Sequence, residues 1–350
     1  MSVDARNKPS LCLVTTGGTV SMTRGSNAAE AALPVSGATA IDPGLRSRYD
    51  IDAVELFRKD SGDFGPGDWS AVVEAVASRW DRYDGFVVSH GTDTLAYTAA
   101  ALALELGAPP LARTVVLTGA MRRADHEQPD GPGNLADACA AASRGYGEVV
   151  VAFAGKVWRG CRVVKRVGPD RDGLDAFHTP GLTPLGGHGH SGGGKPLPAR
   201  HGFADGVLPI ALSPGVGPGL FLDAVRSDAC RAVWLRGYGS GNVPLTGFGG
   251  DGSWIDFVTE ATRRDKPVVL SSPLVGGTTR RDYAGAAAAW DAGAIPAGGV
   301  TEAMAVVKLR WALAKAGARG GAVVPAVRAV MQRDWVGEGG GAEQAPPLPD

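Results

Sequence analysis

Three segments of the chain share one pattern: a run of apolar, mostly β-branched residues stops at a cluster of Thr, Gly and small polar residues. They are residues 11–19, 85–94 and 114–121. A short apolar run bounded by glycines is typical of a buried strand in a parallel sheet. In open sheets of this kind, ligands bind beyond the carboxyl ends of the strands. We therefore expect the three polar clusters to lie together at one site.

The length and composition of the chain narrow the possible functions. At 350 residues it is long for one hydrophobic core, so two α/β domains are expected. Its 35 basic and 36 acidic side chains nearly balance, and no Lys/Arg cluster is dense enough for nucleic acid. There is no uncharged apolar run of membrane-spanning length and no apolar N-terminal signal segment. These features predict a cytoplasmic protein that binds neither nucleic acid nor membrane.

Helix and strand patterns alternate along the chain, which predicts parallel sheets with right-handed crossovers. A helix is expected to begin at residue 66 with Asp68 as its N-cap. Residues 22–40 lack any period and are expected to form a long loop. The other predicted strands are residues 54–57, 85–89, 114–118, 148–153, 208–212, 232–236 and 267–271, and the other predicted helices are 94–106, 133–143, 219–228, 253–264 and 301–317.

The predicted fold is α/β, with two three-layer domains: a larger N-terminal one with a parallel-type sheet and a smaller C-terminal one. The first is expected over residues 1–179 and carries the polar clusters. Residues 180–206 are rich in Gly and Pro and are interpreted as a linker. The second domain is expected over residues 207–338, and residues 339–350 are expected to be a disordered tail.

Two features of the predicted linker resemble functional motifs. Residues 189–195 have the spacing of a phosphate-binding loop, but Pro196 follows, so no helix begins there to direct amides at a phosphate. Four histidines also gather near the linker, where a glycine-rich loop lacks the rigid support that a metal site needs. We therefore favour a solvated loop over a nucleotide or metal site. The histidines are His178, His188, His190 and His201.

The polar clusters contain the parts of an acyl-transfer site. A hydroxyl becomes a nucleophile when a base takes its proton or a cation favours the alkoxide. Donors aimed at the oxyanion contribute on the order of 3 kcal/mol each. Hydroxyls at Thr19 and Thr92, the carboxylate of Asp93 and the amides of Gly18 and Gly91 supply such groups, and a lysine beside Asp93 would complete them. Taken singly, such a threonine is more often a turn or helix-capping residue.

Several motifs along the chain carry a family resemblance. Residues 16–20 (TGGTV), 88–94 (VSHGTDT) and 117–122 (LTGAMR) are similar to the two signature motifs and the supporting strand of the bacterial-type L-asparaginase/glutaminase family. The similarity covers most of the chain, and its C-terminal part resembles the cytoplasmic branch of the family. Further similar segments are residues 60–63 (DSGD), 130–135 (DGPGNL), 159–165 (RGCRVVK), 271–279 (SSPLVGGTT) and 298–309 (GGVTEAMAVVKL).

The resemblance implies hydrolysis of L-asparagine to L-aspartate and ammonia, by double displacement without a metal or an organic cofactor. Thr19 would be the nucleophile and would form an acyl-enzyme with the side-chain amide carbon. Thr92, Asp93 and Lys165 would form a second catalytic group that activates hydroxyl or water. The implied substrate contacts are Asp60, Ser61 and Gly62 at the α-carboxylate and α-amine, Asp93 at the same amine, Gly18 and Gly91 in the two motif turns, and the Ala120 carbonyl at the amide nitrogen.

The resemblance also implies an assembly. In this family a neighbouring subunit completes the site, so a homodimer or homotetramer is expected. The turn at residues 239–242 and the segment 281–283 occupy the comparable positions in this chain. Many members supply a glutamate from the second of these regions. Here residues 279–284 contain none, and Asp282 is the candidate substitute.

One departure concerns the lid. Many members carry a tyrosine that hydrogen-bonds the nucleophilic threonine, but no tyrosine occurs between Thr19 and Pro34. Three interpretations remain open: another group activates Thr19, the lid orders differently, or turnover is slow.

Two other functions remain open on the sequence. One is a related glutaminase or other amidase, because one methylene in a pocket is worth only about 1–3 kcal/mol. The other is a non-catalytic amino-acid-binding sensor on the same scaffold, which the missing tyrosine would permit. All of these functions share a small-molecule amino-acid ligand.

Overall fold

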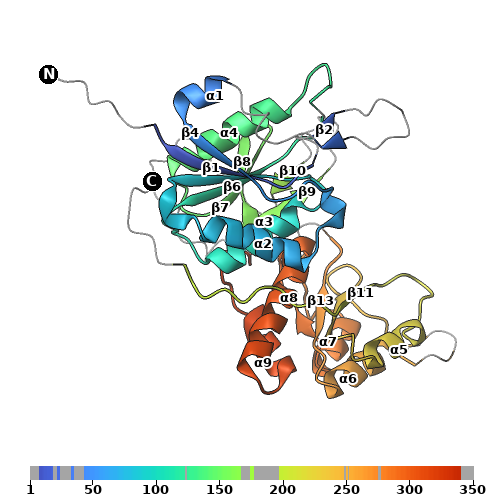
Figure 1. Cartoon of the computed structure of the whole chain (residues 1–350). Helices are drawn as coiled ribbons and strands as arrows, with labels where there is room; N and C mark the ends of the chain where they lie inside the picture. The colour runs from blue at the N-terminus through green and yellow to red at the C-terminus, as the bar shows by residue number, and fades with distance from the viewer. Residues whose placement is uncertain are drawn as a thin grey trace. The chain divides into compact units, whose positions relative to one another are not determined.

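The chain divides into two units between Ala199 and Arg200. The computed structural model describes residues 8–18, 22–23, 33–34, 43–122, 124–166, 174–176, 197–247, 250, 252–274 and 277–339. Each unit has the α/β organisation that the alternating pattern predicts (Figure 1). The domain ranges 1–179 and 207–338 stay predictions. Most of the expected linker and, apart from Gly339, the expected tail lie outside the described residues.

The first unit holds the larger sheet. Within its described residues, short 3-10 helices cover Ser61–Asp63, Trp80–Arg82 and Gly160–Arg162. The helices and strands are β1 (Ser10–Thr15), β2 (Met22–Thr23), β3 (Leu33–Pro34), α1 (Pro43–Arg48), β4 (Asp50–Glu55), α2 (Pro66–Ala77), β5 (Gly85–Ser89), α3 (Leu95–Leu106), β6 (Thr114–Thr118), α4 (Gly131–Arg144), β7 (Val149–Phe153), β8 (Lys156–Arg159), β9 (Val163–Lys165) and β10 (Leu174–Ala176).

The strand order of this sheet is β4-β1-β5-β6-β7-β8. All neighbours are parallel except β8, which pairs antiparallel with β7. From β1 the chain first adds β4 on one side and then returns to add β5 on the other. The strand order therefore reverses beside β1, and in such sheets the crevice at the reversal is where ligands bind. The three apolar runs are β1, β5 and β6, which are adjacent, so their polar clusters end at one edge as predicted.

Alternating side chains of the sheet build two buried layers. Leu11, Leu13, Val87 and Val116 face the same cluster as Leu135 of α4 because successive residues of a strand point to opposite faces. Figure 1 shows α1 and α4 on one side of the sheet and α2 and α3 on the other. Because both faces are covered, the central strands are apolar throughout rather than alternating.

Two local expectations were wrong. Helix α2 does begin at Pro66, but its N-cap is Gly65, and Asp68 occupies the third helical position, where its carboxylate accepts the Gly65 N–H at 2.8 Å. The N-cap lies three residues before Asp68 because Pro66 occupies the first helical position, where its fixed φ and missing N–H suit the helix start. The segment 22–40 also contains the two-residue strands β2 and β3, which pair antiparallel. The rest of that segment lies outside the described residues.

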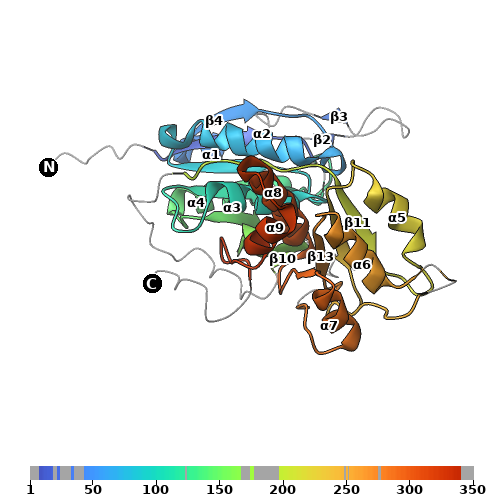
Figure 2. The same cartoon turned by 90° about the horizontal axis from the view of Figure 1, so that it is seen from below.

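The second unit is built on a smaller sheet with strand order β11-β12-β13-β14, in which all neighbours are parallel. Figure 2 gives a second view of its helices. Its elements are β11 (Val207–Ala211), α5 (Gly219–Arg226), β12 (Ala232–Arg236), α6 (Trp254–Arg263), β13 (Val268–Ser271), α7 (Ala284–Asp291), β14 (Ile295–Pro296), α8 (Glu302–Arg319) and α9 (Val323–Met331).

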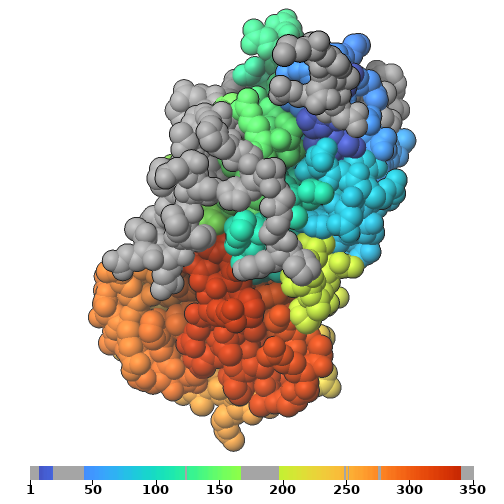
Figure 3. All heavy atoms as spheres, turned by 90° about the vertical axis from the view of Figure 1, so that its left-hand side faces the viewer, coloured from blue at the N-terminus to red at the C-terminus, as the bar shows by residue number. Residues whose placement is uncertain are grey.

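Residues from three strands of the smaller sheet form a hydrophobic cluster with α6. Val233, Leu235 and Leu270 pack with Trp254 and Phe257 of α6. Helix α6 begins at a capping box in which the Ser253 hydroxyl accepts the Asp256 N–H at 3.1 Å. Figure 3 shows part of the surface that α8 and α9 present, in red. No described helix is both long and apolar enough to cross a membrane.

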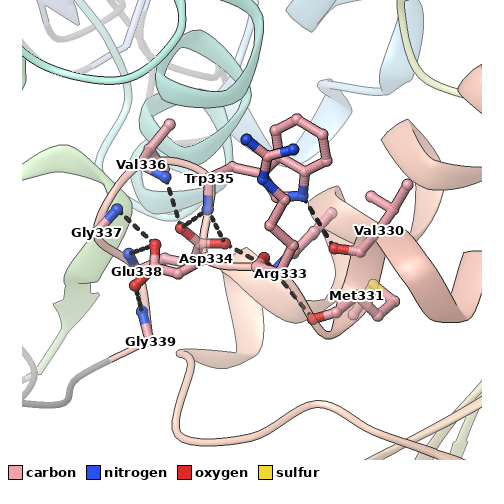
Figure 4. A network of polar contacts seen from close by, with 10 residues as sticks. Val330, Met331, Arg333, Asp334, Trp335, Val336, Gly337, Glu338 and Gly339 are labelled. Carbon is pink, nitrogen blue, oxygen red and sulfur yellow. Dashed lines mark hydrogen bonds and ion pairs between the residues drawn. The ribbon is translucent and has the colours of Figure 1, made fainter. Parts of the chain in front are cut away.

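A buried ion pair joins α8 to the turn that follows α9. The Lys308 ammonium donates to the Glu338 carboxylate at 2.7 Å and to the carbonyls of Met331 at 3.1 Å and Arg333 at 2.7 Å. Lys308 is 2% exposed and Glu338 is 1% exposed. Figure 4 shows the turn, in which the Trp335 N–H also donates to Glu338. The three protons of the ammonium all have acceptors, which is the condition for a buried charge to be tolerated.

Candidate active site

Two glycines shape the chain where β1 ends. Gly17 has φ +99° and Gly18 has φ +81°, both in the left-handed region that favours glycine. A Cβ on Gly17 would lie 2.5 Å from the Lys59 carbonyl oxygen, and one on Gly18 would lie 2.5 Å from the Gly91 nitrogen. The β1 turn is thus held between the chain after β4 and the chain after β5. Thr19, the residue that follows, lies outside the described residues.

The chain after β5 contacts the 3-10 helix at residues 61–63. A Cβ on Gly91 would lie 2.6 Å from the Ser61 hydroxyl oxygen. The Thr94 hydroxyl donates to the Ser61 carbonyl at 2.7 Å. Ser61 is 3% exposed. The structure therefore brings Ser61 beside the 91–94 turn, from a segment about 30 residues away in sequence.

A cation, a hydroxyl and a carboxylate meet at the same edge. The Lys165 ammonium donates to Thr92 Oγ1 at 2.8 Å and to Asp93 Oδ1 at 2.5 Å. Thr92 is 7% exposed, whereas the Asp93 side chain is 69% exposed. Lys165 ends β9, which pairs antiparallel with β10 and not with the main sheet. The hydroxyl that contacts the cation is buried, whereas the carboxylate that contacts it is exposed to solvent.

The substrate-binding segment predicted at residues 60–62 forms a tight turn. Asp60 caps the 3-10 helix, and its Oδ1 accepts the Gly62 N–H at 2.7 Å. The segment is fastened to α2 because the Lys59 ammonium donates to Asp68 Oδ1 at 2.5 Å. That ammonium also lies 5.1 Å from the centre of the Phe64 ring, within reach of a cation–π contact.

A fully buried histidine supports the turn after β5. His90 is 0% exposed; its Nδ1 lies 2.8 Å from the Gly91 carbonyl oxygen and its Nε2 lies 2.9 Å from Thr98 Oγ1. Because a carbonyl can only accept, Nδ1 carries the proton and Nε2 accepts from the Thr98 hydroxyl. Burial lowers the pKa of His90 to about 4. The ring is therefore neutral at pH 7 and holds the Gly91 peptide in one orientation.

Ala120 lies in the loop after β6 and is 1% exposed. The residue before it, Gly119, packs so closely on the β5 turn that a Cβ would lie 2.5 Å from the His90 carbonyl oxygen and 3.1 Å from Thr92 Cγ2. The Ala120 peptide thus adjoins the buried Thr92.

The predicted site residues fall into three groups. The contacts above bring together one group of residues: Gly18, Gly91, Ser61, Thr92, Asp93 and Lys165. The segments that adjoin this group contain Asp60, Gly62 and Ala120. Thr19 is not described. The segment 189–195, whose spacing resembles a phosphate loop, is not described either. Of the four histidines near the linker, His201 is described and the other three are not.

Sequence reasoning missed two supporting residues. His90 stands inside the VSHGTDT motif, but its pattern predicts no role for it, and Thr94 is predicted only as the start of a helix. The available signal was that both residues lie in a polar cluster directly after an apolar strand, where a buried polar group needs a partner. Their partners, Thr98 and the Ser61 carbonyl, are separated from them by 8 and 33 residues, and such pairings require the fold.

The fold and the site define a two-domain α/β protein with a hydroxyl–ammonium–carboxylate group at the carboxyl edge of its larger sheet. Comparison with protein families identifies it further. The model "Asparaginase, N-terminal" matches residues 10–192, and "Glutaminase/Asparaginase C-terminal domain" matches residues 207–320. The chain belongs to the asparaginase family.

Individual relatives agree with this assignment. The chain is 32% identical to an L-asparaginase of Thermococcus kodakarensis, over 94% of this chain and 98% of that one. It is 32% identical to L-asparaginase 1 of Escherichia coli, over 88% and 93%. The solved structure of the thermostable L-asparaginase from Thermococcus kodakarensis superposes with a TM-score of 0.78 at 29% identity, covering 95% and 98%.

Proposed function

We propose that this protein hydrolyses L-asparagine to L-aspartate and ammonia, with Thr19 as the nucleophile. Family membership and the relatives' stated activity support the reaction. The observation that carries the proposal is the Lys165 ammonium, which contacts both the Thr92 hydroxyl and the Asp93 carboxylate. A cation on a buried hydroxyl is one of the ways in which such a group becomes reactive.

The reaction proceeds in two displacements. The Thr19 hydroxyl oxygen bonds to the side-chain amide carbon, the carbon–nitrogen bond breaks, and the hydroxyl proton leaves with the nitrogen as ammonia. Water then attacks the resulting ester, releases aspartate and returns a proton to Thr19. Splitting one hydrolysis into two steps replaces a difficult attack on an amide by an easier attack on an ester.

Thr92, Lys165 and Asp93 serve the proton transfers. The ammonium stabilises negative charge on the Thr92 oxygen, so that this hydroxyl can relay a proton from the attacking group. Asp93 balances the ammonium and faces solvent, where it is available to the substrate amine. Asp60, Ser61 and Gly62 bind the α-carboxylate and α-amine, Gly18 and Gly91 let the backbone approach the substrate closely, and Ala120 offers its carbonyl to the amide nitrogen.

We further propose a cytoplasmic homodimer or homotetramer in which a neighbouring subunit completes the site. The proximity of the two implied regions supports this: the N–H of Arg280, which directly precedes the 281–283 segment, donates to the Ser240 carbonyl in the 239–242 turn at 3.0 Å. Tyr283 is 54% exposed there. The four cysteines are free and buried, as suits a reducing compartment. Sedimentation of the purified chain tests the assembly, and a monomer would contradict it.

Ammonia release from asparagine tests the proposed reaction. Thr19→Ala and Lys165→Met should each reduce kcat by about 10²-fold or more, the usual loss when a nucleophile or a proton-transfer group is removed. Lys156→Met, which alters an exposed lysine on β8, is the matched control and should retain wild-type activity. Undiminished hydrolysis by the Thr19→Ala protein would rule out the nucleophile assignment.

A further inference from the structure

We propose that Asp130 and Asn134 are positioning residues that aim the Ala120 carbonyl at the leaving nitrogen of the substrate and make it a stronger acceptor. The inference rests on the proposed function, in which that carbonyl contacts the amide nitrogen. Both residues belong to the DGPGNL motif at residues 130–135, to which the mechanism above assigns no role.

The carboxylate of Asp130 holds the peptide that contains the Ala120 carbonyl. Asp130 Oδ2 accepts the Met121 N–H at 2.9 Å, and Oδ1 accepts the Arg122 N–H at 2.7 Å. The Ala120 carbonyl and the Met121 N–H belong to one planar trans peptide, so they point in opposite directions. A carboxylate that holds the N–H therefore directs the carbonyl away from itself.

Asn134 fixes the peptide on the other side of Ala120. It is 3% exposed, and its Nδ2 donates to the Gly119 carbonyl at 2.9 Å and to Asp130 Oδ2 at 3.3 Å. Its Oδ1 accepts the Ala154 N–H at 2.9 Å, in the turn after β7. The amide thus ties the loop after β6 to both Asp130 and the neighbouring strand, and both peptides of Ala120 are held.

These contacts are not needed to cap α4. Asp130 occupies the N-cap position of α4, but its side chain makes no capping hydrogen bond to that helix. Both carboxylate oxygens are instead used on the loop at residues 121–122. A purely structural N-cap would accept an N–H of the first helical turn, so the carboxylate serves the loop.

Because the leaving group of the substrate is a nitrogen, the contacts of Asp130 and Asn134 are expected to affect the rate of acylation. A peptide whose N–H is bonded to a carboxylate is polarised, which strengthens its carbonyl as an acceptor. The substrate nitrogen gains positive character and protons as it leaves, so its hydrogen bond to the Ala120 carbonyl strengthens in the transition state and accelerates acylation. An ester leaves as an alcohol whose oxygen carries no hydrogen in the substrate, and it cannot use this acceptor in the same way.

The test compares an amide with an ester of the same acid. We expect Asp130→Asn and Asn134→Ser to lower kcat/KM for asparagine by about tenfold, the effect of weakening one transition-state hydrogen bond. For the β-methyl ester of aspartate, which releases methanol, the loss should stay within about twofold. Ammonia and methanol release give the two rates, and kcat/KM reports acylation for both substrates.

Asp265→Asn is the matched control. In the second unit, the Asp265 carboxylate likewise accepts two successive backbone N–H groups, from Val323 at 2.6 Å and Val324 at 2.8 Å. Its substitution removes a similar structural contact and should leave the amide-to-ester ratio unchanged. Asn134→Ser decides the question if Asp130→Asn does not fold.

The outcomes distinguish the positioning role of Asp130 and Asn134 from the proposed hydrolysis of asparagine. A selective loss on the amide supports the inference. Equal losses on amide and ester would overturn it, while the proposed hydrolysis would stand. A wild-type protein that releases neither ammonia nor methanol would overturn the proposed function and this inference with it.

Discussion

His90 shows how a single residue ties the sheet to the chemistry at its edge. Its backbone N–H donates to the Thr118 carbonyl at 2.8 Å, and its ring holds the Gly91 carbonyl and the Thr98 hydroxyl. The ring of Phe64 lies 4.5 Å from it, centre to centre. A charged imidazolium in this enclosure would lose its hydration and the acceptor role of Nε2. His90 is therefore neutral, and its ring fixes the turn after β5 through two hydrogen bonds.

The pH dependence of stability follows from this burial. The pKa of His90 is about 4 in the folded chain, lowered from 6.5, so between these values the unfolded chain binds more protons. The free energy of unfolding should therefore rise with pH from 4 to 6.5, by about 3 kcal/mol from this residue. Urea unfolding of the wild type and His90→Gln across this range measures it. The variant should lack that part of the slope, and His126→Gln, at an exposed histidine, should keep it.

How far the sequence predicts the site differs from residue to residue. Thr92 and Asp93 follow an apolar run, and the general rule for strand ends is enough to locate them. Lys165 ends a short strand outside the main sheet and reaches Asp93 across 72 residues. Residue patterns alone predict that a lysine lies beside Asp93 but do not identify which lysine. The family resemblance is what points to Lys165. The roles of these residues stay predictions.

At the scale of elements, the turns after β1 and β5 depend on one close backbone contact. Gly18 combines a left-handed φ of +81° with a gap too small for a Cβ beside the Gly91 nitrogen. Either condition favours glycine, and together they hold the two signature segments against each other. The contact joins strands that adjoin at the reversal of strand order.

Gly18→Ala should therefore be more harmful than the backbone conformation alone explains. We expect about 2–4 kcal/mol of destabilisation, from left-handed strain plus the clash, together with loss of most activity. Gly155→Ala is the control, because Gly155 has φ +73° in the same unit but open space around its Cβ position. It should cost only about 1 kcal/mol. Equal destabilisation in urea melts would contradict the role of the close contact.

The sequence pattern predicts some helices and strands with their bounds and does not predict others. Residues 85–89, 114–118 and 232–236 are strands with the predicted bounds, since apolar runs between glycines or polar residues mark buried strands clearly. The pattern did not predict β8, whose partner β7 precedes it across a short turn, or helices α7 and α9. Helix α7 is mostly alanine and carries little periodic signal, so its helical state depends on packing in the second unit.

At the scale of the whole molecule, each unit has its own hydrophobic core. The second unit also has a buried ion pair that joins elements distant in sequence. In the second unit, Lys308 and Glu338 are 30 residues apart and couple the longest described helix to the end of the described chain. Removing one partner of a buried ion pair leaves the other charge without compensation. The residues after α9 are therefore part of the unit's structure.

Glu338→Gln should destabilise the second unit by about 3–5 kcal/mol. Thermal unfolding followed by tryptophan fluorescence measures the change, because Trp335 lies in the turn that this carboxylate holds through the Trp335 backbone N–H. Glu302→Gln is the control, since its ion pair with Arg236 is 36–44% exposed, and it should cost less than about 1 kcal/mol. Similar melting temperatures for Glu338→Gln and the wild type would show that the pair contributes little.

In the proposed reaction one acyl-enzyme on Thr19 lies between the substrate and aspartate. Competition between water and hydroxylamine for this intermediate tests it most directly. Wild-type protein is given asparagine or the β-methyl ester of aspartate at one hydroxylamine concentration, and aspartate and its β-hydroxamate are quantified. A shared intermediate partitions without regard to the group that has left. We therefore predict the same hydroxamate-to-aspartate ratio from both substrates and no product of either kind from Thr19→Ala. Ratios that differ between amide and ester would contradict the proposed intermediate.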